Sequence, residues 1–168
     1  MKLILFRHAI AMEREEAQLK KIEDGKRPLT PKGKEKSEQM VKELLRLCPD
    51  VDMIVCSPLL RSQQTSEIIA KAYKISKIDQ SAELVPEAPP MAFIQWLSQF
   101  ARRKLAVVAV GHEPHLSTLA SWVLAGKTDS ILELKKSGFA ILEVDDLTQI
   151  VSGRATLELL VQPRAFVK

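Results

Sequence analysis

Residues 105–112, Leu-Ala-Val-Val-Ala-Val-Gly-His, are apolar for six positions and then change to glycine and histidine. An uninterrupted apolar run of this length predicts a strand that is buried on both faces, as in the centre of a parallel sheet. The run is much too short for a membrane span, which needs about 20 apolar residues. The sequence therefore predicts an α/β domain in which His112 follows the carboxyl end of a central strand.

Other apolar runs alternate along the chain with segments of helical periodicity, which favours a mostly parallel sheet. Strands are expected over residues 2–6, 53–56, 105–110 and, more weakly, 78–84. Helices are expected from Thr30-Pro31, from Ser57-Pro58, over residues 91–100 and from Pro114, with Thr30 and Ser57 as helix caps. Residues 13–27 are expected to form a loop or a short exposed helix, and residues 139–144 and 155–161 an antiparallel hairpin. The predicted fold is a three-layer α/β/α sandwich.

Length and composition indicate one domain over residues 1–168, because 46% apolar and 27% charged residues are typical of a soluble globular protein. Cys48 and Cys56 are too few for a disulfide framework or a cysteine-rich metal site, and they fit a reducing compartment. The apolar start of the chain is interrupted by Arg7-His8, so it is too short for a signal peptide. We expect a cytoplasmic protein that does not associate with membranes.

The net charge of +4 favours anionic partners, which include nucleic acids, phosphorylated proteins and phosphorylated metabolites. Aromatic residues make up only 5%, and no basic block is interleaved with residues that could stack on bases. Scattered basic pairs such as Lys135-Lys136 are interpreted as solvated surface. Nucleic acid is therefore the disfavoured partner.

Cationic side chains and imidazoles follow the ends of three predicted strands. Arg7 and His8 follow the first, Ser57 and Arg61 the second, and His112 the central one. Parallel strands place their carboxyl ends, and the helix N-termini after them, at one edge of a sheet. Two arginines and two imidazoles gathered there would repel unless an anion lay between them, and the arginine fork matches a phosphate. The pattern predicts a phosphate pocket.

Four motifs resemble those of the histidine phosphatase superfamily, the phosphoglycerate mutase-like proteins. Leu5-Phe6-Arg7-His8-Ala9 resembles the Arg-His-Gly signature, with Ala9 in the glycine position, and residues 57–65 (Ser-Pro-Leu-Leu-Arg-Ser-Gln-Gln-Thr) resemble the Ser-Pro-x-x-Arg-x-x-x-Thr element. Val110-Gly111-His112 resembles the second histidine motif. Residues 27–33, Arg-Pro-Leu-Thr-Pro-Lys-Gly, resemble the SixA-type phosphohistidine phosphatases. The order of the motifs matches the family, and the resemblance implies its phosphoglycerate mutase-like fold.

The resemblance also implies a mechanism. His8 would be the nucleophile that becomes a phosphohistidine, while Arg7, Arg61 and His112 would hold the non-bridging phosphate oxygens. No metal or other cofactor is implied, because the arginines supply the countercharge. Imidazole is a less basic leaving group than an alkoxide, so phosphohistidine needs less help from a general acid.

Further residues are candidates with more than one interpretation. Glu87 is the candidate general acid, with Glu83 as the alternative, and either is equally well explained as a solvated loop carboxylate. Arg27 would border the entrance of the pocket or be an exposed loop charge, and Ser57 would be a phosphate neighbour as well as a cap. His115, three residues after His112, is expected to pack or to lie at the surface.

The substrate is predicted from the short segment between Glu87 and His112, which has room for one helix and one strand but not for a large cover. A shallow, uncovered pocket admits a side chain of another protein and gives a small metabolite few walls to contact. Phosphohistidine on a protein is therefore the predicted substrate. The alternatives are a small-molecule phosphomonoesterase or mutase and, less favoured because both histidines and both arginines are intact, a non-catalytic phosphate-binding module.

Overall fold

A six-stranded sheet forms the centre of the protein, and the computed structural model describes residues 1–165. The order of the strands is β3-β2-β4-β1-β5-β6, in which β3, β2, β4 and β1 are parallel. The last two strands are antiparallel to their neighbours, which confirms the C-terminal hairpin. The strands are β1 (Lys2–Arg7), β2 (Met53–Cys56), β3 (Ile78–Gln80), β4 (Ala106–Gly111), β5 (Phe139–Glu143) and β6 (Thr156–Val161).

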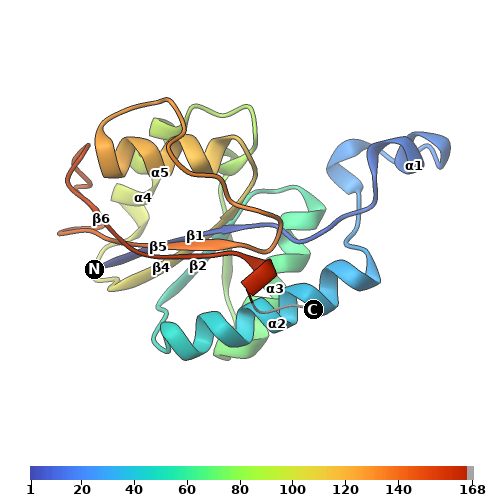
Figure 1. Cartoon of the computed structure of the whole chain (residues 1–168), viewed down its shortest axis with the longest axis horizontal. Helices are drawn as coiled ribbons and strands as arrows, with labels where there is room; N and C mark the ends of the chain where they lie inside the picture. The colour runs from blue at the N-terminus through green and yellow to red at the C-terminus, as the bar shows by residue number, and fades with distance from the viewer. Residues whose placement is uncertain (166–168) are drawn as a thin grey trace.

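Helices cover both faces of this sheet. Helices α2 and α3 lie on one face and α4 and α5 on the other, so the predicted three-layer sandwich is confirmed (Figure 1). The helices are α1 (Arg14–Leu19), α2 (Pro31–Leu47), α3 (Leu60–Tyr73), α4 (Pro90–Phe100) and α5 (His115–Ala125), with short 3-10 segments η1 (Asp24–Lys26), η2 (Ala82–Leu84) and η3 (Pro163–Ala165). No helix in the described part of the chain is both long and apolar enough to cross a membrane.

Strand β4 takes part in the hydrophobic core on both sides of the sheet. Val107 and Ala109 belong to the cluster beneath α4 and α5, whereas Val108 and Val110 belong to the cluster beneath α2 and α3. All its residues are buried, which agrees with the prediction of a central strand. Leu105, at the predicted start, lies outside the strand and its side chain is 65% exposed.

Helix α2 begins as the sequence predicts. Pro31 is its first residue, and the Thr30 hydroxyl accepts a hydrogen bond from the Gly33 N–H at 3.0 Å. A Cβ at position 33 would overlap the carbonyl oxygen of Ile10, which follows β1. Glycine at this position therefore lets the start of α2 approach the loop that carries the candidate nucleophile.

Two local predictions are wrong. Ser57 does not cap the next helix, because α3 begins at Leu60 and its start has no side-chain cap. The weak strand ends at Gln80 instead of Leu84, where η2 follows. Between β1 and α2, residues 13–28 form an excursion that contains α1 and η1. It projects beyond the end of β1 (Figure 1).

Candidate active site

The register of the parallel strands brings the predicted residues to one edge of the sheet. Arg7 pairs with Gly111, so the next residues, His8 and His112, lie side by side with their ring centroids 4.7 Å apart. Strand β2 pairs in parallel with β4 on its other side, and the Ser57 N–H donates to the Val110 carbonyl of β4 at 3.1 Å. The hydroxyl of Ser57 lies 2.6 Å from His112 Nε2. Its role is thus to hold a histidine, not to cap a helix.

The His8 ring is held in one tautomer. Its Nδ1 lies 2.7 Å from the carbonyl oxygen of Ala9, which can only accept, so Nδ1 carries the proton and Nε2 keeps its lone pair. Burial, together with the nearby charges of Arg61 and Arg7, lowers the pKa of His8 to about 3. The ring is therefore neutral at pH 7, as a nucleophile requires.

Thr65 connects the His8 loop to helix α3. Its hydroxyl oxygen accepts a hydrogen bond from the Ala9 N–H at 3.0 Å, and it donates to the Arg61 carbonyl at 2.7 Å. Ala9 is fully buried at this contact. The threonine four residues after Arg61 thus fixes the position of His8 relative to the helix that carries this arginine.

Three arginines are each anchored to the backbone through Nη1, and Arg27 is also held through Nε by the Asp24 carboxylate at 2.9 Å. In every case Nη1 donates to a backbone carbonyl, which leaves other guanidinium nitrogens for a ligand. The acceptors of Arg7, Arg27 and Arg61 are the carbonyl oxygens of Leu134 at 2.6 Å, Met12 at 2.5 Å and Asp24 at 2.9 Å, respectively. Burial lowers the pKa of Arg7 and Arg61, but a guanidinium stays charged at neutral pH.

These side chains surround a cavity of about 210 Å³. Three buried atoms of its lining residues have no hydrogen-bond partner in the described structure, namely Arg7 Nε, Arg61 Nε and His112 Nδ1. An unpaired buried polar atom costs about 1–3 kcal/mol, so each of these three nitrogens lacks a partner that would stabilise it. The cavity is lined by Arg7, His8, Ala11, Glu13, Arg14, Arg27, Arg61, Pro86, His112, Glu113 and Lys136.

The remaining predicted residues lie outside the cavity lining. Glu87 is exposed, although its neighbour Pro86 lines the cavity, and Glu83 is half-buried away from it. His115 is not at the surface, since only 2% of it is exposed and neither ring nitrogen has a hydrogen-bond partner among residues 1–165. It does not line the cavity.

Four charged lining residues were not predicted from the sequence. Lys136 lines the cavity while its side chain is 37% exposed, so the solvated surface predicted for Lys135-Lys136 extends to the cavity at the second lysine. Glu13 and Arg14 come from the excursion before α2, and no local pattern marks them. Glu113 directly follows His112 at the end of a strand, and this position could have marked it as a candidate for the site. Its carboxylate already accepts hydrogen bonds from the Ser117 hydroxyl and the Leu134 N–H, at 2.5 and 2.9 Å.

The three histidines make the stability of the fold sensitive to acid. Burial lowers the pKa of His8, His112 and His115 to about 3, 2 and 4, whereas an unfolded histidine takes up a proton near pH 6.5. These histidines contribute fully to the free energy of unfolding above pH 6.5. As the pH falls toward 4, each histidine loses about 1.4 kcal/mol of this contribution for every pH unit. We expect a Tm that drops between pH 7 and pH 5 in thermal unfolding followed by circular dichroism.

The variant His115→Gln isolates one of these groups without touching the cavity. Its Tm should fall less steeply with pH than that of the unchanged protein, because one of the three histidines no longer takes up a proton on unfolding. Identical slopes for the two proteins would show that His115 is not neutral in the folded state.

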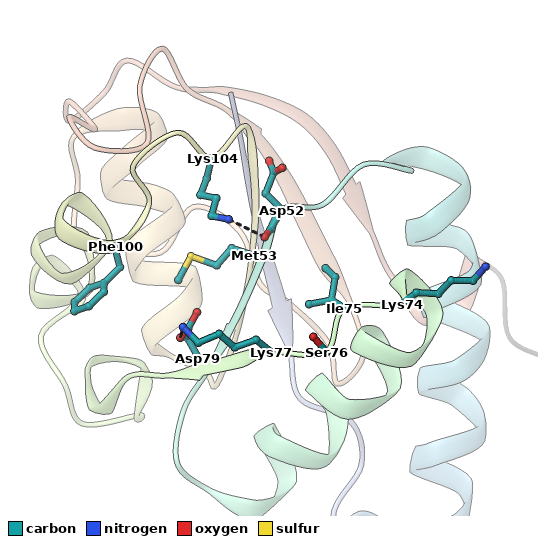
Figure 2. A pocket seen from close by; sticks show the side chains of 9 residues that line it. All are labelled: Asp52, Met53, Lys74, Ile75, Ser76, Lys77, Asp79, Phe100 and Lys104. Atoms are coloured by element: carbon teal, nitrogen blue, oxygen red, sulfur yellow. Dashed lines mark hydrogen bonds and ion pairs between the residues drawn. The ribbon is translucent and has the colours of Figure 1, made fainter.

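A larger cavity of about 400 Å³ lies at the opposite edge of the sheet, where the parallel strands begin (Figure 2). No histidine lines it, Lys77 pairs with Asp79 at 2.6 Å, and two backbone N–H groups hold the Asp52 carboxylate. Helices α3 and α4 end there, at Tyr73 and Phe100, and helix C-termini carry a partial negative charge that disfavours anions. Size therefore does not identify the phosphate site; the chemistry at the smaller cavity does.

Among residues 1–165, no group of three or more His, Cys, Asp or Glu residues could hold a metal ion.

Comparisons with known proteins agree with this geometry. Residues 3–85 match the model of the histidine phosphatase superfamily (branch 1). The chain is 37% identical over 139 residues to an uncharacterized protein of Picosynechococcus sp., with 82% of each chain covered. It is 24% identical over 168 residues to the phosphohistidine phosphatase SixA of Escherichia coli, with 97% of this chain and 94% of that protein covered.

Solved structures share the fold at lower identity. The protein histidine phosphatase SixA complexed with tungstate has a TM-score of 0.82 at 22% identity, covering 98% of this chain and 99% of that one. The alpha-ribazole phosphatase from Shigella flexneri has a TM-score of 0.67 at 18% identity, covering 97% of both chains. The fold is thus the phosphoglycerate mutase-like fold that the motifs imply. Taken with the match over residues 3–85, these findings show that the chain belongs to the histidine phosphatase superfamily.

Proposed function

We propose that this chain is a phosphatase that removes the phosphoryl group from phosphohistidine on a protein, through a phosphohistidine intermediate on His8. The observation that carries the proposal is that Arg7, Arg61 and His112 line one cavity together with a neutral, tautomerically fixed His8. Together they provide an anion site with a nucleophile beside it.

In the first step, the lone pair on His8 Nε2 attacks phosphorus in line with the bond to the substrate nitrogen. The new N–P bond forms on His8 as the old one breaks, and the released imidazole takes up a proton. In the second step, water attacks the phosphorus of phospho-His8 and the N–P bond breaks again. The proton lost by the water returns to the acid that supplied the first one, hydrogen phosphate leaves, and neutral His8 is regenerated. Two such displacements divide one difficult reaction into two easier ones.

The arginines would stabilise the charge on the three non-bridging oxygens. Because their Nη1 atoms are already bound to backbone carbonyls, the guanidinium groups are kept at the cavity before the substrate arrives. Preorganised positive charge of this kind supplies most of the acceleration in phosphoryl transfer. His112, fixed by Ser57 and neutral because burial lowers its pKa to about 2, would offer its free ring nitrogen to the same phosphoryl group.

Glu87 remains the predicted donor of the proton that the leaving group takes up. This carboxylate is exposed beside Pro86, at the rim and not in the lining, while Glu113 is held by its own hydrogen bonds. A leaving imidazole places less demand on a general acid than an alkoxide does. An acid that stands outside the lining is therefore consistent with a phosphoramidate substrate.

The size of the cavity supports a side chain of a protein as the substrate. A volume of about 210 Å³ is below the roughly 300–1,000 Å³ of typical small-molecule sites, and so it holds little more than the phosphorylated ring. The similarity to SixA of Escherichia coli, named a phosphohistidine phosphatase, supports the same substrate. The similarity in fold to an alpha-ribazole phosphatase keeps a small-molecule phosphomonoester as the second candidate.

A substrate profile tests this proposal. We expect kcat/KM for a phosphohistidine-bearing protein to exceed that for phosphoglycerate and sugar phosphates, with a synthetic aryl phosphate as a generic reporter. Turnover should persist in EDTA, because arginines and not a metal ion would carry the countercharge. Faster turnover of the small phosphates would replace the proposed substrate by the second candidate, and loss of activity in EDTA would contradict the mechanism.

A further inference from the structure

Asp24 contacts three of the four arginines of the cavity without lining the cavity itself. It is the first residue of η1, in the excursion between β1 and α2. Its carbonyl oxygen accepts from Arg61 Nη1 at 2.9 Å, and its carboxylate lies 3.3 Å from the same nitrogen. The other carboxylate oxygen accepts from Arg27 Nε at 2.9 Å and lies 3.4 Å from Arg14 Nε.

The two closer partners of Asp24 are buried, which distinguishes these contacts from an ordinary surface ion pair. The side chains of Arg27 and Arg61 are only 9% and 3% exposed, whereas that of Asp24 is 50% exposed. Surface pairs contribute little because water screens them, but a buried guanidinium has few alternative partners. The carboxylate therefore has a strong influence on where these two side chains lie.

The loss of Asp24 would leave each arginine with fewer fixed contacts. Arg27 would keep only its bond to the Met12 carbonyl, and Arg61 only its bond to the backbone at position 24. One hydrogen bond through Nη1 lets the planar guanidinium turn about that contact, while a second contact fixes its plane. Since phosphoryl transfer depends on position, a change in this plane is expected to slow the reaction.

We propose that Asp24 is a positioning residue, which aligns the guanidinium groups of Arg61 and Arg27 for the transition state while remaining outside the cavity. The inference rests on the proposed function, because it assigns Asp24 a part in the same reaction. It does not make Asp24 a ligand of phosphate: a carboxylate and a phosphate repel, and Asp24 removes positive charge from the site.

The substitution Asp24→Asn tests this, with Glu23→Gln as the matched control. Glu23 precedes Asp24 and, among residues 1–165, pairs only with exposed Lys26, at 2.9 Å. We expect Asp24→Asn to lower kcat with an aryl phosphate by about 10- to 100-fold and to weaken binding of orthovanadate, which copies the five-coordinate transition state, by a similar factor. The inhibition constant of inorganic phosphate should stay within about threefold, since the site loses no positive charge. Glu23→Gln should behave like the unchanged protein.

A second comparison shows whether Asp24 acts through Arg61. In an Arg61→Ala background, Asp24→Asn should cause a clearly smaller further loss than it causes alone, because one of the two positioned groups is gone. The inference is overturned if Asp24→Asn keeps the full kcat, if phosphate binding and Tm fall in step with kcat, or if the two losses are independent. Failure of the proposed function would show differently, as the wrong substrate order or as turnover without His8 in proteins that retain Asp24.

Discussion

Replacing His8 by alanine is expected to reduce turnover by at least about 10³-fold with both a phosphohistidine-bearing protein and an aryl phosphate. The substitution removes the nitrogen that the hydrogen bond from Nδ1 to the Ala9 carbonyl leaves free for attack. Steady-state rates measure the loss. Brief incubation with labelled substrate, denaturation at alkaline pH and separation of the protein measure the intermediate directly, because phosphate bound to histidine survives alkali and is then released by acid.

The control for this variant is binding, because the arginines are unchanged. His8→Ala should still bind inorganic phosphate, and its Tm should remain close to that of the unchanged protein at pH 7.5. His115→Gln, which alters a buried histidine outside the cavity, should still incorporate the acid-labile label. An unchanged rate or label in His8→Ala would exclude His8 as the nucleophile.

Replacing Arg61 by alanine should lower kcat by about 10²–10³-fold, the loss typical of a single preorganised donor to a developing oxyanion. This side chain is 3% exposed, and its buried Nε has no hydrogen-bond partner within the described part of the chain. It also carries the contacts that join Asp24 to α3. The same experiment with Arg61→Lys should recover only part of the rate, because an ammonium group cannot reproduce the planar fork.

Arg46→Ala is the matched control for Arg61. Arg46 lies in the last turn of α2, exposed and paired only with Glu43 at 3.0 Å, so its loss should change kcat by less than about twofold. A similar loss in both variants would point to a general effect of net charge. A rate close to normal in Arg61→Ala would remove this residue from the site.

Much of the fold could be predicted because the signals are local. The apolar run from residue 106 to 110 is buried on both faces of the parallel sheet, and Thr30-Pro31 starts a helix through hydrogen bonds within one turn. The same signal failed at Ser57-Pro58, where the hydroxyl is drawn to His112 on a neighbouring strand. A side chain that can cap a helix can also bind a tertiary partner, and the local pattern does not show which of the two will prevail.

The arrangement of His8, Arg61 and His112 could be anticipated for a different reason. Parallel strands end at one edge of a sheet whatever the loops between them do, so residues at equivalent positions after β1, β2 and β4 must be neighbours. Arg27 was assigned from a family motif, and the structure places it in the cavity lining. Glu87 is exposed next to Pro86, which lines the cavity, and does not line the cavity itself.

The sequence alone determined the α/β architecture and the strand ends that carry two imidazoles and two guanidinium groups, since periodicity and parallel pairing are properties of short segments. Tertiary structure decided that Asp24 and Lys136, from segments with no distinctive pattern, join the arginines at the cavity. The path of a long loop depends on surfaces that exist only after the sheet and helices have packed, and the contact between Asp24 and Arg61 spans 37 positions of the chain. No spacing rule along the chain could therefore have revealed it.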